Sequence, residues 1–345
     1  MWHIRGLLLA LPVLVYAMPT ACAGNFTNIV AFGDSLTDVG NLYAAYAYPP
    51  DPPYWNGRFS NGPVWVEYLA QNYGLAAPTP SSSGGSDYAW GGAVTGTATL
   101  PPGVLTQVGQ YLSNVGNTAD SNALYIVWAG ANDAFNDPVN FDPVASAQNV
   151  ATAVQTLYGA GARTFLVPNM PPLEKTPYAL ANLSNAALLG LDAQAFNSDL
   201  SADLASLQAG DAGIGFMDMN LKNVDPNVGD VDGVYNCVNY LIAHPVNPPY
   251  WDFQDVTDEG SQAGPPADGS TYLFWDDVHP TTVADQLLAD TVPVPEPGTL
   301  ILLSAAWLFG LPLGWRRLYY LFRPQPIAPS HGRFPSARTS AASHR

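Results

Sequence analysis

Four short runs of apolar residues alternate along the chain with longer, amphipathic stretches. They cover residues 28–32, 124–128, 164–167 and 214–217, the last interrupted by a glycine. A short run that is apolar throughout indicates a strand buried on both faces. Such strands, when separated by helices, form parallel sheets that helices cover on both sides. The pattern therefore predicts an α/β domain with three layers, α/β/α, and a mostly parallel sheet.

Two of the stretches between these runs have helical spacing. In the first, Asp142 can cap a helix, Pro143 fits its first turn and Gly159 ends it. The second covers about residues 184–208 and has a rougher apolar face. We expect a helix over each of them.

Two other segments predict loops. Residues 47–58 are rich in proline and aromatic residues, and residues 224–269 are long and rich in Pro, Gly, Asp and Asn. Long loops inside a compact domain are commonly functional. Because Trp251 and Phe253 lie in the longer segment, we expect it to form an ordered flap over an active site.

The first 23 residues have the features of a secretory signal peptide. A short cationic start precedes an apolar run at 6–16, and Ala21-Cys22-Ala23 is typical of a cleavage site. The run is too short for a membrane helix, and Pro12 interrupts it. The alternative is a lipoprotein anchor through Cys22, but the large aliphatic residue expected three positions upstream is missing. We expect cleavage after residue 23 and a secreted or envelope-located domain.

Residues 293–317 resemble the PEP-CTERM sorting signal. A Val294-Pro295-Glu296-Pro297 box precedes an apolar stretch at 298–315, which at about 18 residues just spans a bilayer core, and Arg316-Arg317 follows. The resemblance implies membrane association through this helix, then cleavage by an exosortase, in a Gram-negative producer of exopolysaccharide. The Pro-, Ser- and Arg-rich tail at 318–345 is predicted to be disordered and is longer than such signals usually carry.

The charge of the chain is concentrated between the two terminal signals. Of 28 Asp and Glu residues, 27 lie within residues 24–292, but only four of the 11 Lys and Arg residues do. A domain this acidic repels phosphate backbones, which excludes nucleic acid as a partner. No repeat or change of composition divides residues 24–292, so we expect one domain.

A histidine with an adjacent carboxylate is the first candidate for chemistry. His279 lies in Asp276-Asp277-Val278-His279-Pro280, whereas no acid lies within four residues before His244. A carboxylate three residues earlier can hold one ring nitrogen across a tight turn, which leaves the other free to accept a proton. We assign His279 as a base oriented by Asp276, with Asp277 as a rival and an ordinary surface turn as the alternative.

Ser35 is the candidate nucleophile. It follows the first apolar run directly, and Gly33 permits a sharp turn there before the chain enters a helix. This placement exposes the hydroxyl at the carboxyl end of the sheet, where backbone N–H groups can meet a forming anion. The alternative is that Ser35 simply caps the helix.

The residues around Ser35 and His279 resemble the GDSL lipase/esterase family, also called SGNH hydrolases. Residues 32–41 match its first block and residues 275–281 its last. Between them, residues 87–93 resemble the second block, with Asp87 in place of the usual Asn, and residues 130–133 match the Gly-x-Asn-Asp block. Residues 57–65 also look like a stretch common in the family.

This resemblance implies a flavodoxin-like fold with a sheet of about five strands and no cofactor or metal. It also implies an acyl-enzyme on Ser35, with His279 as base and Asp276 holding the imidazole. The oxyanion would be met by the N–H groups of Ser35 and Gly92 and by the side-chain amide of Asn132. The implied activity is hydrolysis of carboxylic esters.

Other functions remain as alternatives at this point. A zinc hydrolase would find few ligands in two histidines and Cys237, which we interpret as a structural or incidental thiol. A calcium loop at residues 225–233 lacks two ligand positions. A non-catalytic envelope or matrix-binding protein could use the same fold.

The substrate is left open by the sequence. A lipid, a short acyl ester and an acetylated polysaccharide are all compatible with the sequence. The sorting signal slightly favours an exopolysaccharide-linked ester. Four aromatic residues could line a sugar or acyl site or pack in the core: Tyr54, Trp55, Phe59 and Trp65.

Overall fold

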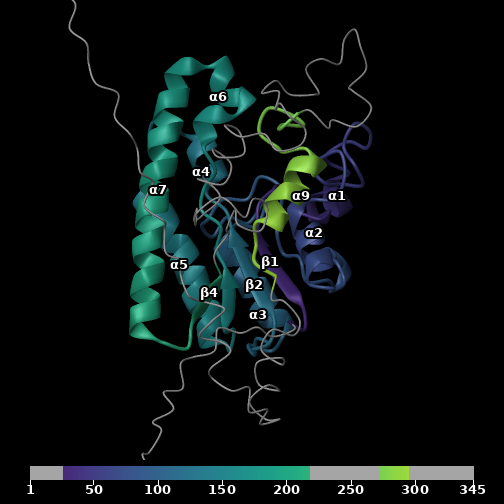
Figure 1. Cartoon of the computed structure of the whole chain (residues 1–345), viewed down its shortest axis with the longest axis vertical. Coiled ribbons are helices and arrows are strands. Elements are labelled where there is room, and N and C mark those ends of the chain that lie inside the picture. Colours follow the sequence, from purple (N-terminus) through teal and green to yellow (C-terminus); the bar gives the residue numbers. More distant parts are fainter. Residues whose placement is uncertain (1–25, 218–271, 295–345) are drawn as a thin grey trace, which may run out of the picture. The chain divides into compact units, whose positions relative to one another are not determined.

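A parallel sheet lies at the centre of the protein (Figure 1). The computed structural model describes residues 26–217 and 272–294. Its strands β1 (Ile29–Gly33), β2 (Leu124–Trp128), β3 (Thr164–Leu166) and β4 (Gly215–Met217) lie side by side in chain order. Every residue of β1 and β2 is buried, as expected of runs that are apolar throughout. The four predicted strands are therefore confirmed.

A further extended segment lines the free edge of β1. Ala31 N–H donates to the Ser86 carbonyl (3.0 Å), and the Ala31 carbonyl accepts from Tyr88 N–H (2.7 Å). Trp90 N–H then donates to the Gly33 carbonyl (3.1 Å). The segment runs parallel to β1 without forming a regular strand. Four regular strands plus this segment agree with the prediction of about five.

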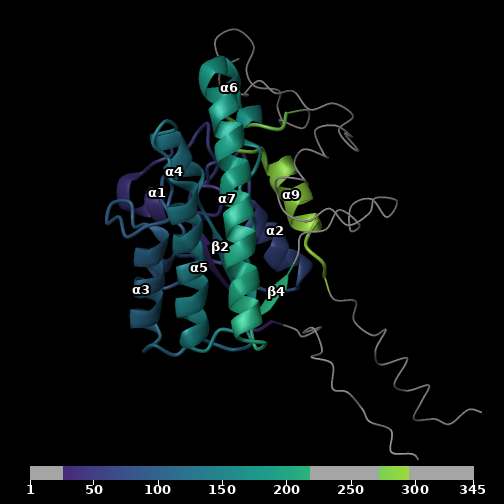
Figure 2. The same cartoon turned by 90° about the vertical axis from the view of Figure 1, so that its left-hand side faces the viewer.

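Helices cover both faces of the sheet, so the three-layer α/β/α prediction is confirmed (Figure 2). Successive strands are neighbours, and each connection between them places one long helix on the same face, as right-handed crossovers do. These are α3 (Val104–Asn114), α5 (Pro143–Gly159) and α7 (Leu183–Gly210), which pack on Val30, Phe32 and alternate residues of the other strands. On the opposite face, α2 (Trp65–Asn72) and α9 (Thr282–Asp290) pack on Ile29, Ala31 and their neighbours.

Both predicted helices are present. α5 has the predicted bounds, and Asp142 caps it by accepting from Ala145 N–H at 3.0 Å. The predicted helix at 184–208 is α7. The remaining elements are short: α1 (Asn41–Tyr46), α4 (Ala131–Asn136), α6 (Pro177–Ala181), and the 3-10 turns Ser81–Ser83 and Leu173–Lys175. Residues 47–58 contain neither helix nor strand, as predicted.

The chain does not enter a helix directly after Ser35, so that detail of the prediction was wrong. A turn intervenes, and α1 begins only at Asn41. The Asp34 carboxylate accepts from Leu36 N–H (3.1 Å), and the Asp38 carboxylate accepts from the N–H groups of Gly40 and Asn41. Such local side-chain bonds compete with helical ones and hold the turn.

Several predicted segments lie outside the described residues. They are the signal peptide, the flap at 224–269, the calcium-like loop, His244, Cys237, the sorting helix and the C-terminal tail. All described residues belong to one unit, Met1–Pro295. Across residues 26–217 and 272–294, no helix combines the length and apolar character needed to cross a bilayer.

Candidate active site

Ser35 and His279 meet at the carboxyl end of the sheet. Ser35 follows β1, and His279 precedes Thr281, whose side chain caps α9. The Ser35 Oγ and the His279 Nε2 lie 2.7 Å apart, although 244 positions separate the residues in the chain. This is the hydrogen-bond distance required between a nucleophile and its base.

The carboxylate of Asp276 faces the other ring nitrogen. His279 Nδ1 lies 2.7 Å from Asp276 Oδ2 and 2.8 Å from Oδ1. Oδ1 also accepts from the backbone N–H groups of Val278 (2.9 Å) and His279 (2.8 Å), which hold the turn. Asp277, the rival acid, is exposed, and its backbone carbonyl accepts from Tyr178 N–H.

Asp276 has a further partner that the sequence did not indicate. The Tyr54 hydroxyl donates to Asp276 Oδ2 at 2.5 Å. Burial raises the pKa of Asp276, but the charge and hydrogen bond of His279 and the Tyr54 hydroxyl outweigh it and lower the pKa to about 2. Asp276 is thus held as a carboxylate at neutral pH.

The predicted oxyanion donors come from three segments: Ser35 follows β1, Gly92 follows the extended segment beside β1, and Asn132 lies in α4. Within the described residues, the N–H groups of Ser35 and Gly92 have no hydrogen-bond partner. Gly92 adopts a φ of +78°, a conformation that glycine tolerates best, and the Gly91 N–H beside it donates to Asp38 at 2.9 Å. One hydrogen of the Asn132 amide goes to the Ala93 carbonyl (3.0 Å), which leaves the other available.

One cavity joins several of these groups. It has a volume of about 100 Å³, and Ser35, Asn132 and His279 line it. Gly92 is not part of the lining. The rest of its wall comes from α4, α9, the strand ends and the segments 171–176 and 273–280. Apart from Asp34 and Thr176 it is apolar: Leu36, Trp128, Ala131, Phe135, Pro171, Pro172, Leu173, Leu273, Phe274, Val278, Pro280, Ala284 and Leu288.

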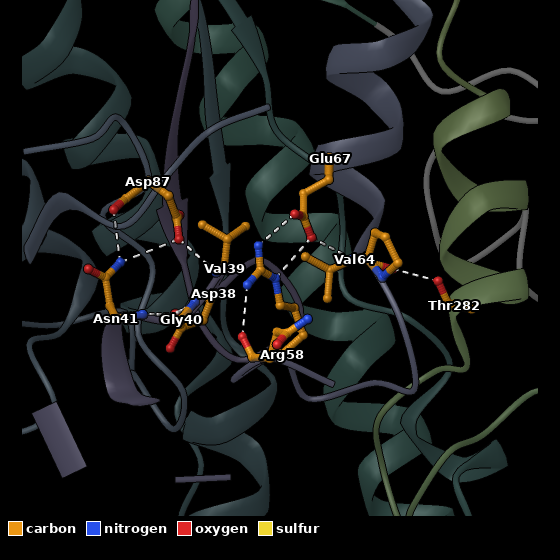
Figure 3. Close-up of polar contacts among 11 residues, drawn as sticks. Asp38, Val39, Gly40, Asn41, Arg58, Val64, Glu67, Asp87 and Thr282 are labelled. Atoms are coloured by element: carbon orange, nitrogen blue, oxygen red, sulfur yellow. Dashed lines mark hydrogen bonds and ion pairs between the residues drawn. The ribbon is translucent and has the colours of Figure 1, made fainter. Parts of the chain in front are cut away.

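Asp87, where the family usually has Asn, joins two of the matched blocks. Its carboxyl accepts from Val39 N–H (2.8 Å), Ala89 N–H (3.1 Å) and the Asn41 side chain (3.3 Å). Figure 3 shows that Asn41 bonds both acids, with its side chain to Asp87 and its backbone N–H to Asp38. Burial and the charge of Asp38 raise the pKa of Asp87 well above its usual value. A protonated Asp87 can fill the place of a neutral amide.

The stretch at 57–65 braces the segment that carries His279. Arg58 pairs with Glu67 at 2.7 Å, and Glu67 also accepts from Val64 N–H at 3.0 Å (Figure 3). The Thr282 hydroxyl donates to the Pro63 carbonyl (2.8 Å), and Ser60 donates to the Pro280 carbonyl (2.9 Å). These contacts give the 57–65 stretch a structural role beside the site.

Gln107 is a second residue that the sequence did not single out. From α3, its side-chain oxygen accepts from Gly33 N–H (2.9 Å) and its amide donates to the Gly33 carbonyl (2.8 Å). It therefore holds both backbone groups of the residue that ends β1, two positions before Ser35. No local pattern distinguishes this glutamine from others on a helix.

The buried acids of the domain predict that its stability falls as pH rises. Burial raises the pKa of Asp34 to about 7 and those of Asp38, Asp87 and Asp285 in the same direction. Between pH 4 and 7 the folded state therefore keeps protons that the unfolded chain has lost. For Asp34 this lowers the unfolding free energy by about 1.4 kcal/mol per pH unit in that window, and the other three acids act in the same direction.

Calorimetry between pH 4 and 8 should show Tm highest near the acidic end and decreasing toward neutral pH. Asp285→Asn, in α9, removes one of these titrating carboxyl groups without changing Ser35 or His279. The Tm of this variant should therefore decrease less steeply with pH. Asp290→Asn in the same helix is the control and should not change the slope. A Tm that increases from pH 4 to pH 7 would contradict the assignment of raised pKa values.

Metal-binding groups are sparse in the described part of the chain. Residues 26–217 and 272–294 contain no group of three or more His, Cys, Asp or Glu residues that could hold a metal ion.

Comparison with known proteins gives consistent matches. A family model described as GDSL-like lipase/acylhydrolase matches residues 29–292, and one for the PEP-CTERM protein-sorting motif matches residues 293–317. An acetylesterase of Thermothelomyces thermophilus is 27% identical over 296 residues, covering 79% of this chain and 89% of that protein. A phosphatidylcholine-sterol acyltransferase of Aeromonas hydrophila is 33% identical, but the match covers only 45% of this chain and 47% of the relative.

Among solved structures, a lipolytic protein of the G-D-S-L family from Veillonella parvula is similar in 76% of this chain and 93% of its own. Its sequence identity is 16% and the TM-score is 0.41.

Proposed function

Because the chain belongs to the GDSL-like lipase/acylhydrolase family and is a carboxylic ester hydrolase, we propose that it cleaves esters through an acyl-enzyme on Ser35. The observation that carries this proposal is the pair of contacts at His279, 2.7 Å to Ser35 Oγ and 2.7 Å to Asp276. Nucleophile, base and orienting carboxylate are thus in one hydrogen-bonded chain.

The first half of the reaction forms the acyl-enzyme. Neutral His279 carries its proton on Nδ1, facing Asp276, so Nε2 can accept the Ser35 proton as Oγ attacks the ester carbonyl carbon. The tetrahedral oxyanion would be met by the N–H groups of Ser35 and Gly92 and the free amide hydrogen of Asn132. Collapse of this intermediate breaks the bond to the alcohol oxygen, which takes the proton from His279.

The second half releases the acid. Water enters, His279 Nε2 accepts its proton, and the hydroxide attacks the acyl carbon on Ser35. Collapse returns the proton to Ser35 Oγ and frees the carboxylic acid. Asp276 stays ionised throughout and stabilises the imidazolium that forms in each half, in keeping with its low pKa of about 2.

We further propose that the acyl group is short and occupies the apolar cavity beside Ser35. A cavity of about 150 Å³ holds benzene, so the cavity of about 100 Å³ at Ser35 fits about four carbons. The acyl carbonyl would lie at Ser35, and the chain would lie against Phe135, Leu173 and their apolar neighbours.

Hydrolysis of nitrophenyl esters of increasing acyl length tests both parts of the proposal. From acetyl to butanoyl, kcat/KM should increase about fourfold per methylene, the factor that corresponds to the free energy of moving one CH2 out of water. For chains of eight or more carbons, kcat/KM should fall. Absence of hydrolysis for every ester, in buffer with EDTA, would overturn the hydrolase mechanism on Ser35. A maximum at acetyl would overturn only the acyl assignment and favour an acetylated glycan.

A matched pair of variants locates the acyl site. Phe135 lines the cavity and packs edge-to-face on Tyr178 (ring centroids 5.2 Å), which does not line it. Phe135→Ala should move the optimum to longer chains, because it enlarges the cavity by the volume of a ring. Tyr178→Ala removes the same ring contact and should leave the optimum unchanged.

The PEP-CTERM motif at residues 293–317 marks the protein for extracytoplasmic sorting. We propose four parts: a signal peptide (1–23), the SGNH hydrolase domain (24–292), the sorting signal with its membrane helix (293–317) and a disordered basic tail (318–345). In this arrangement the helix holds the protein at the membrane until an exosortase cleaves the signal. The ester substrate would then be met at the cell envelope.

A further inference from the structure

Tyr54 reaches the hydrogen-bonded chain of the active site from a distant loop. Its hydroxyl donates to Asp276 Oδ2 at 2.5 Å, across 222 positions of sequence. The same oxygen lies 2.7 Å from His279 Nδ1. Asp276 Oδ2 is therefore shared between the imidazole and the tyrosine.

The ring of Tyr54 is held from two sides. It packs against the buried pair Tyr272 and Trp275, close to Asp276 in the chain. It also meets Phe59 edge-to-face (ring centroids 6.1 Å), and Phe59 in turn lies against the imidazole of His279 at 4.8 Å. The direction of the hydroxyl is thus set by packing rather than by the hydrogen bond alone.

We propose that Tyr54 is a positioning residue that orients Asp276 toward His279 and limits how strongly the carboxylate attracts the imidazolium. The inference rests on the proposed roles of Ser35, Asp276 and His279. It adds a fourth member to their chain, supplied by the 47–58 loop.

The physical effect of the hydroxyl is on charge as well as geometry. A donor on Oδ2 draws negative charge away from His279, so the carboxylate attracts the imidazolium less strongly. The Tyr54 bond is also one of the causes that keep the pKa of Asp276 low. Among the described residues, Asp34 also interacts with His279: burial raises the pKa of Asp34 to about 7, and the positive charge of His279 acts against this rise.

Tyr54→Phe keeps the ring and removes the hydroxyl. The acidic limb of the kcat/KM profile, which reports the free enzyme, should then move to higher pH by about half a unit. A hydrogen bond to a charged group changes the pKa of that group, here Asp276, by about one or two units. Only part of this effect is passed on to the acidic limb, through His279. We expect kcat to fall about threefold to tenfold, because Asp276 is held less firmly toward His279. KM should stay within about twofold, because the substrate contacts are intact.

Tyr48→Phe is the matched control. Tyr48 lies in the same loop and packs on the same Phe59 ring at 5.8 Å, but its hydroxyl forms no hydrogen bond within the described residues. Its pH profile should be that of the wild type. Tyr54→Leu separates packing from hydrogen bonding, since it loses the ring as well.

The outcomes are distinct. A shifted limb in Tyr54→Phe supports the proposal. An unshifted limb in Tyr54→Phe, with a loss of activity only in Tyr54→Leu, would overturn it and leave Tyr54 as a packing residue. If wild-type activity survives Ser35→Ala, the proposed function itself fails, and that result does not depend on Tyr54.

Discussion

Ser35→Ala is expected to lower hydrolysis of nitrophenyl butanoate to less than about a thousandth of the wild-type rate. Ser35 Oγ is the atom 2.7 Å from the base His279, so the variant has no oxygen to acylate. Removing the nucleophile of such a chain costs about a millionfold in kcat, with a remainder that comes from binding and the oxyanion donors. KM for the ester should change little.

A fluorophosphonate probe gives an independent measurement on the same pair of proteins. The wild type should be labelled at the peptide that contains Ser35, and the variant should not react. Ser113→Ala is the control and should behave as the wild type, because Ser113 is an exposed serine on α3 whose hydroxyl bonds the Gly109 carbonyl. Residual hydrolysis above about a thousandth would mean that another nucleophile acts. Labelling also separates the enzyme from a non-catalytic binding protein.

The sequence was most informative where one local pattern decides the structure. β1 and β2 are apolar at every position, and only a sheet covered on both faces buries such runs. α5 begins at Asp142 and Pro143 because the cap and the first turn select those residues. The contact of Asp276 with His279 has a similarly local cause. The Asp276 carboxylate accepts from the backbone N–H groups of Val278 and His279, and these bonds close the turn between the two residues.

Long-range contacts could not be inferred in this way. Tyr54 looked like a ligand-lining or core aromatic, and its hydrogen bond to Asp276 depends on how the 47–58 loop folds against a segment 222 positions away. Gln107 could not be identified from the sequence either, because its two bonds to Gly33 follow from the packing of α3 on β1. The turn at 34–40 replaced an expected helix because two carboxylates took the backbone donors.

Asp276→Asn is expected to reduce kcat by about ten-thousandfold, the cost of holding the base in its wrong tautomer. Asp276 accepts from four donors: Tyr54 OH, Val278 N–H, His279 N–H and His279 Nδ1–H. An asparagine offers one oxygen, and its NH2 group must then face some of these donors. If it donates to Nδ1, the proton of the neutral ring moves to Nε2, which can no longer accept from Ser35.

The effect on stability should be far smaller than the effect on rate. The pKa of Asp276 lies below its usual value, so its contribution to stability is present above pH 4 and is lost as pH falls through about 2. The drop from 3.8 to about 2 corresponds to about 2 kcal/mol, whereas a ten-thousandfold rate loss corresponds to about 5.5 kcal/mol. Assays well below Tm therefore measure the chemistry rather than unfolding.

Asp277→Asn is the neighbouring control, because Asp277 is exposed and the contacts to His279 Nδ1 come from Asp276. It should retain wild-type kcat. Equal losses in the Asp276 and Asp277 variants would show that the charge of the turn matters rather than the orientation of the imidazole. A large loss at Asp276 alone, with KM nearly unchanged, would follow from a carboxylate whose task is to keep the Nδ1 proton in place while Nε2 takes the proton of Ser35.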